Sequence, residues 1–158
     1  MSRATDVVDR LAGPVVPVNI CFTEDDAVDY AAMERYVDWL CTERVPVVLL
    51  TYGSSEFAAL SPDEIWQLTE LFARTVAGRS LFVASTGYYT IDESRDFLRR
   101  ADQAGVDAVK VQINPWLGQG RDVIIRYFDG IRDATEMPLI VWGAWPDPYP
   151  IDAVRELA

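Results

Sequence analysis

The segment that decides the fold lies between residues 108 and 114 and reads Ala108-Val109-Lys110-Val111-Gln112-Ile113-Asn114. Apolar side chains alternate with polar ones from Val109 to Asn114. Because successive side chains of a β-strand point to opposite faces of its sheet, this alternation predicts a strand with one apolar and one polar face. We expect that strand to span Ala108–Ile113.

Four more short apolar runs, rich in Val and Ile, predict further strands at Val15–Phe22, Pro46–Thr51, Leu81–Ser85 and Leu139–Trp142. Amphipathic helical stretches separate the runs. Ser61 with Glu64, and Thr90 with Glu93, form capping boxes that begin two of the helices. Strict alternation of strands and helices predicts a parallel sheet with right-handed crossovers.

Two α/β architectures contain such units. A central strand of an open doubly wound sheet carries helices on both faces and is apolar on both. A strand of a (β/α)₈ barrel places apolar side chains under the helices and others in the lumen. The alternation at 108–114 therefore favours a TIM barrel with about five of its eight units present, an incomplete barrel. An open doubly wound sheet is the alternative. We expect residues 1–158 to form one domain, with an extra helix within residues 1–12.

The composition excludes several classes of site. The 158 residues include no histidine, which excludes Ser-His-Asp and Cys-His nucleophile systems and histidine-ligated zinc. A net charge of −11 argues against nucleic acid and anionic membranes as partners. No apolar run approaches the ~20 residues of a membrane span. Cys21 and Cys41 are predicted to be buried free thiols of a cytoplasmic protein. No metal and no cofactor is predicted.

Six short motifs follow one another along residues 13–158. They are Ile20–Asp29, Tyr52–Glu56 with Leu60-Ser61, Ser85–Gly87, Ala104–Ala108, Asn114–Leu117, and Pro138–Trp142 with Pro146. Their order and spacing resemble those of the dihydrodipicolinate synthase / N-acetylneuraminate lyase family. None of the motifs is specific alone, and the resemblance depends on their being collinear.

This resemblance implies a barrel of the class I aldolase type. Members bind pyruvate or a related 2-keto acid as a Schiff base on a lysine of the sixth strand. A tyrosine of the fifth strand relays protons, and the subunits commonly form tetramers. The resemblance therefore implies a cytoplasmic, homo-oligomeric lyase whose partner is a small 2-keto acid or another small carboxylate, here as a fragment or a diverged member.

The carboxylate-binding motif of the family maps onto Ser54 and Ser55, and Glu56 follows them. These three residues stand after the second predicted strand, at the carboxyl end where α/β sites lie. Hydroxyl groups and successive backbone N–H groups suit a small carboxylate. A polar surface loop with no ligand is the alternative for the same residues.

Other positions depart from the family pattern. Gly53 stands where the family has a relay threonine, Trp142 replaces the relay tyrosine, and Leu117 replaces a second tyrosine. An indole donates a hydrogen bond but does not shuttle a proton at neutral pH. With Asn114 and Trp116, these residues are expected to line the pocket, although tryptophans equally suit core or subunit packing. The sixth-strand lysine lies beyond the five predicted strands, so the chain alone is expected to be inactive.

Lys110 is the only lysine and the one candidate catalytic residue. On the lumen face, a desolvated amine has a lowered pKa and forms Schiff bases. Its expected position in mid-strand, three residues before Ile113, favours a structural role instead. In that role the buried amine pairs with an acid such as Asp107 or one from a neighbouring strand.

The leading functional hypothesis is a lyase or aldolase-type enzyme that acts on pyruvate or a related 2-keto acid. The alternative is a non-catalytic carboxylate-binding or scaffold protein with the same fold. A third is a complete doubly wound domain with an unrelated ligand. Five strands of a barrel leave an apolar edge along Leu139–Trp142, which we expect a second copy of the chain to cover.

Overall fold

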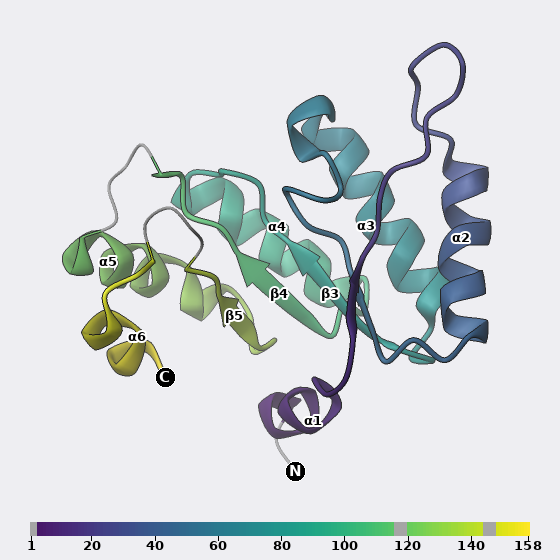
Figure 1. The fold of residues 1–158 in the computed structure, drawn as a ribbon. Helices are drawn as coiled ribbons and strands as arrows, with labels where there is room; N and C mark the ends of the chain where they lie inside the picture. The colour runs from purple at the N-terminus through teal and green to yellow at the C-terminus, as the bar shows by residue number, and fades with distance from the viewer. Residues whose placement is uncertain (1–2, 116–119, 144–147) are drawn as a thin grey trace.

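Five parallel strands form a single sheet in the computed structural model, which describes residues 3–115, 120–143 and 148–158. The strands lie side by side in chain order (Figure 1): β1 (Val15–Pro17), β2 (Val47–Leu49), β3 (Leu81–Ser85), β4 (Ala108–Val111) and β5 (Leu139–Val141). A doubly wound sheet reverses its strand order at a switch point. The sequential order observed here is that of a barrel segment.

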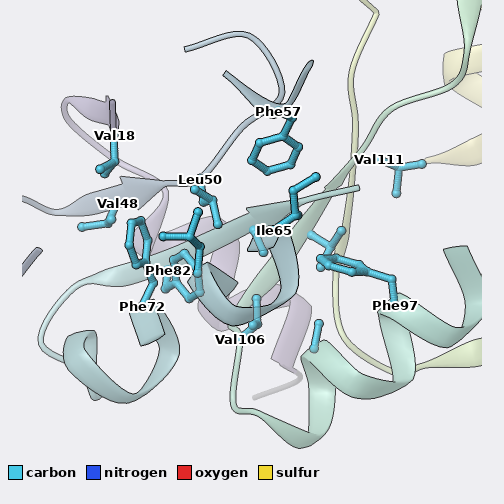
Figure 2. Close-up of a cluster of buried hydrophobic side chains, with 14 of the residues drawn as sticks. Val18, Val48, Leu50, Phe57, Ile65, Phe72, Phe82, Phe97, Val106 and Val111 are labelled. Atoms are coloured by element: carbon cyan, nitrogen blue, oxygen red, sulfur yellow. The ribbon is translucent and has the colours of Figure 1, made fainter. Parts of the chain in front are cut away.

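The helices are α1 (Arg3–Arg10), α2 (Tyr30–Thr42), α3 (Pro62–Val76), α4 (Ile91–Gln103), α5 (Arg121–Ile131) and α6 (Ile151–Leu157), with 3₁₀ turns η1 (Phe57–Ala59) and η3 (Arg132–Ala134). Helices α2 to α6 contribute to one core on one face of the sheet. In this core Phe82 of β3 packs with Phe72 of α3, and Phe97 of α4 belongs to the same core further along the sheet (Figure 2).

The alternation in β4 has the predicted structural meaning. Val109, Val111 and Ile113 are buried in the helix-side core. Ala108 belongs to a separate cluster on the opposite face, to which Lys110, two residues further on, also points. One covered face and sequential strand order confirm parallel (β/α) units of a barrel. The open doubly wound alternative does not fit either observation.

Strand β3 has the predicted bounds, whereas the other four strands end earlier than the apolar runs do. Beyond β2, Leu50 N–H still donates to Val83, and the chain then turns at Tyr52. Beyond β4, Gln112 N–H donates to the Thr86 hydroxyl, 2.8 Å away, instead of to a strand carbonyl. The pattern of apolar and polar side chains does not show where a backbone N–H changes from a strand carbonyl to another acceptor, so it does not predict the strand ends.

Helix α1 covers the amino ends of the strands, on the face opposite the other helices. Val7 packs in a small apolar cluster made by the first residues of β2, β3 and β4 and by Val83. Arg10 donates to the Asp107 carboxylate and to the Ser80 carbonyl, each at 3.1 Å. Figure 1 shows α1 beneath the sheet.

Both predicted capping boxes are present. The Ser61 hydroxyl accepts from Glu64 N–H at 3.2 Å, and the Glu64 carboxylate accepts from Ser61 N–H at 2.8 Å. Thr90 begins α4 in the same way. Both cysteines are free, but only Cys41 is fully buried, so the expectation for Cys21 was too strong. Within the described residues, no helix is long and apolar enough to cross a membrane.

The two neighbouring valines of α1 provide a test of its packing. Val7 is 4% exposed and Val8 is 69% exposed. Val7→Ala is expected to lower the free energy of unfolding by about 2 kcal/mol, because it removes buried carbons and leaves a cavity. Val8→Ala is the matched control and should change it by less than about 0.5 kcal/mol. Urea unfolding of both variants measures this, and equal effects would contradict the docking of α1.

Candidate active site

Lys110 lies near the carboxyl end of β4, one residue before the strand ends. It pairs in the sheet with Ser85 of β3 and Ile140 of β5. The early end of β4 corrects the predicted mid-strand position, because the strand stops at Val111 rather than at Ile113. The side chain is 5% exposed although it points away from the helices. The carboxyl ends of barrel strands are where catalytic groups lie.

The amine of Lys110 contacts a hydroxyl and an aromatic ring. Its Nζ donates a hydrogen bond to Thr51 Oγ1 and lies 4.5 Å from the ring centroid of Trp142. The predicted pairing with Asp107 is wrong. Asp107 stands before β4, at the amino end of the strand, and accepts from Arg10 and from Phe82 N–H. In the part of the chain that the structure describes, no carboxylate forms a salt bridge with Lys110.

Burial changes the protonation of this amine. Desolvation lowers the pKa of Lys110 from its ordinary value of 10.5 to about 8. A nearby carboxylate would oppose that shift, and none is paired with it among the described residues. At pH 7 roughly a tenth of the molecules therefore carry the neutral, nucleophilic amine. The face of the Trp142 ring attracts the charged form of the amine.

The turn after β2 holds the residues predicted to bind a carboxylate. Ser54 and Glu56 are exposed, and Glu56 has a left-handed backbone with φ of 52°. Ser55 is fully buried. Its hydroxyl donates to the Val18 carbonyl at 2.6 Å and accepts from Thr51 N–H at 3.0 Å. Ser55 therefore ties the turn to the end of β1 and positions Thr51.

Sequence reasoning missed Thr51. It follows β2 by two residues and so projects to the same face as Leu49, toward the lumen. A signal was present, since Thr51 is the last residue of the predicted strand and a polar side chain at a lumen position. The residue was not singled out because the family motif begins one position later, at Tyr52. The structure brings Thr51 together with Lys110, whose positions are 59 residues apart.

Further polar groups gather beside Lys110 at the ends of β3 and β4. The Ser85 hydroxyl donates to the Lys110 carbonyl at 3.1 Å. Gln112 Nε2 donates to the Tyr88 hydroxyl at 3.4 Å, and the Tyr88 ring lies 4.2 Å from that of Tyr52. Gln112 Oε1 is buried and has no hydrogen-bond partner among the described residues. We call Thr51, Ser85, Lys110, Gln112 and Trp142 the lumen cluster.

The other residues expected to line a pocket have varied surroundings. Gly53 is exposed in the turn after β2, Asn114 is half-buried after β4, and Trp142 stands over Lys110. Trp116 and Leu117 lie outside the described residues. A cavity of about 460 Å³ lies elsewhere, between α5, β5 and α6, and Arg132, Asp129 and Glu156 contribute its charged lining. None of the residues that line this cavity belongs to the lumen cluster.

The depressed pKa of Lys110 predicts how stability depends on pH. Between pH 8 and 10.5 the unfolded chain binds more protons than the folded one, so the free energy of unfolding rises with pH. The full rise is about 3 kcal/mol. Lys110→Met should lack it. All other residues are the same in the two proteins, so the difference between their urea-unfolding curves at each pH isolates Lys110. Parallel pH profiles would contradict the burial of a charged amine.

Structures of known proteins share this fold. An N-acetylneuraminate lyase from Mycoplasma synoviae aligns with a TM-score of 0.82 at 22% identity, over 94% of this chain and 51% of that one. A dihydrodipicolinate synthase from Oceanobacillus iheyensis aligns with a TM-score of 0.78 at 23% identity, over 89% and 47%. Both likenesses establish the barrel fold, of which the chain contains about half.

Sequence comparison gives relatives of a similar kind. A 4-hydroxy-tetrahydrodipicolinate synthase from Methanothermobacter thermautotrophicus is 28% identical over 153 residues, 94% of this chain and 54% of the relative. An uncharacterized DapA-like lyase from Pyrococcus abyssi is 24% identical over 151 residues, 94% and 50%. The chain thus spans about half the length of these relatives. The sequence model of the dihydrodipicolinate synthetase family matches residues 10–146, and the chain belongs to that family.

Proposed function

We propose that this chain forms the carboxylate-binding part of a lyase or aldolase-type barrel that acts on pyruvate or a related 2-keto acid. Membership of the family supports the reaction class. The observation that carries the proposal is the contact between Thr51 and Lys110, because it joins the turn after β2 to a buried amine at the carboxyl end of β4. A keto acid needs both features, one for its carboxylate and one for its carbonyl group.

The turn offers donors for the carboxylate. Ser55 N–H donates to the Thr51 carbonyl and Glu56 N–H to the Gly53 carbonyl. The N–H groups of Gly53 and Ser54 take no part in these bonds, and the Ser54 side chain is exposed. We expect these two successive N–H groups and the Ser54 hydroxyl to bind the carboxylate. Such a local site is needed in a chain with a net charge of −11, whose overall field repels anions.

We do not expect this chain alone to turn over a keto acid. The family's relay positions hold Gly53, Trp142 and Leu117 here, and none of these side chains moves a proton at neutral pH. The family's Schiff-base lysine belongs to a sixth strand. No cofactor is invoked, since a carbonyl, an amine and a carboxylate site suffice for this chemistry.

The second candidate is a non-catalytic protein that binds small carboxylates or acts as a scaffold. The observation that favours it is Trp142 at the relay position, 45% exposed and without an acid–base group. Both candidates include a cytoplasmic homo-oligomer. In the described sheet β5 pairs only with β4, and a second copy is the proposed cover for its outer edge.

Binding of pyruvate tests the carboxylate site. Pyruvate is expected to quench tryptophan fluorescence as it settles beside Trp142, whereas the uncharged analogue pyruvamide should bind at least about tenfold more weakly. Ser54→Ala should weaken pyruvate binding by about tenfold, since one hydrogen bond to a charged group is lost. Thr42→Ala, exposed at the end of α2, is the control and should bind normally. Equal affinity for pyruvate and pyruvamide would refute the carboxylate site.

A further inference from the structure

We propose that Lys110 is a nucleophilic amine that condenses with the carbonyl group of a small 2-oxo acid or aldehyde and forms an imine within the lumen cluster. The choice of a 2-oxo acid rests on the proposed function, whereas the reactivity of the amine does not. This lysine stands on β4, so it is a different residue from the sixth-strand lysine that the family resemblance implies.

The first support is the absence of a counter-charge. A structural lysine in a protein interior normally pairs with a carboxylate, because an unpaired buried ammonium loses its hydration without compensation. Among the described residues Lys110 has a hydroxyl and an aromatic ring as its contacts, and the candidate acid Asp107 binds Arg10 instead. Burial without a paired carboxylate favours the neutral amine, which is the form that attacks a carbonyl.

The second support is the position of the Trp142 ring, 4.5 Å from the amine. A protonated imine carries its positive charge at the same nitrogen as the ammonium. The ring face therefore stabilises the product as it stabilises the starting cation. The ring also covers the amine, which remains 5% exposed in an otherwise open sheet, and shields an imine from hydrolysis.

The third support is the unpartnered amide oxygen of Gln112. It belongs to the residue two positions after Lys110, just beyond the end of β4, where the extended chain still places side chains two residues apart on the same face. Its Oε1 is buried and accepts no hydrogen bond within the described residues, which is costly unless a ligand supplies a donor. The carbinolamine formed when an amine adds to a carbonyl has a new hydroxyl group that can donate to this oxygen.

The reaction balances without a further reagent. The lone pair of the neutral Lys110 amine forms the bond to the carbonyl carbon, and the carbonyl oxygen receives a proton from the nitrogen. The carbon–oxygen bond of the carbinolamine then breaks, the second N–H proton leaves with the oxygen, and water departs. A carbon–nitrogen double bond remains, and its nitrogen takes up one proton from solvent water to give the protonated imine. The Thr51 hydroxyl, already bonded to Nζ, positions the nitrogen during these transfers.

Reductive trapping tests the inference, and the single lysine makes the result unambiguous. The whole chain is incubated with pyruvate, or separately with propanal, in the presence of cyanoborohydride. Intact mass and peptide mapping then locate the adduct. We expect one reduced adduct on Lys110 with each probe. Peptide mapping distinguishes it from reaction at the N-terminal amine, which serves as an internal reference.

Three variants provide the controls. Lys110→Arg and Lys110→Met should both lose the mapped adduct while circular dichroism confirms that each is folded. In the double variant Lys110→Met with Arg35→Lys, the only lysine is exposed on α2. That lysine should react at least roughly tenfold more slowly than Lys110, because an exposed amine stays protonated at pH 7.

The outcomes separate this inference from the proposed function. Adducts with both probes support both. An adduct with propanal and none with pyruvate supports the reactive amine and contradicts the carboxylate site. Pyruvate that binds by fluorescence but gives no adduct with either probe overturns the inference and leaves the proposed function standing. A lysine at position 35 that reacts as fast as Lys110 also overturns it.

Discussion

The structure depends on burying one face of a parallel sheet under helices while leaving the other face to a lumen. Val48, Phe82 and Val109 lie on the covered face and pack with helices α2 to α5. Since side chains alternate along a strand, every residue between two such positions must point into the lumen. The side chains on the lumen face therefore cannot join the apolar core under the helices. At the carboxyl ends of the strands this constraint brings Thr51, Ser85 and Lys110 to one place.

The fold could be predicted from the sequence, because the period of a strand and the period of an amphipathic helix can each be recognised within a single segment. The alternation at Val109 to Asn114 predicted both the face that α5 covers and the barrel architecture, and the capping boxes predicted where α3 and α4 begin. The residues at which the strands end could not be predicted from the sequence, because they depend on hydrogen bonds to the neighbouring strand. Gln112 illustrates this, since its N–H leaves the ladder for the Thr86 hydroxyl.

The candidate site was only partly predictable. The turn at Ser54 and the single lysine were identified, because residue type and spacing indicate them. The roles inside the site depend on geometry between distant segments. Ser55 was expected to face a ligand, yet its hydroxyl bonds the Val18 carbonyl 37 residues away. Asp107 is three residues from Lys110, but it stands at the opposite end of the strand and pairs with Arg10. The prediction relied on the short sequence separation between Asp107 and Lys110, but the direction of the strand places the two residues at opposite ends of β4.

Helix α1 is the first helix of the chain, and its partners come late. Each strand pairs with the next in sequence, so the sheet can assemble unit by unit through contacts of modest sequence separation. Arg10, in contrast, bonds Ser80 and Asp107, which follow it by 70 and 97 residues, and Arg3 bonds the Val106 carbonyl 103 residues later. During synthesis Val7 therefore stays uncovered until the chain has been made as far as Asp107 and Ala108. Contacts between distant segments raise the contact order and slow folding, so the docking of α1 is set to be a late event on the folding pathway.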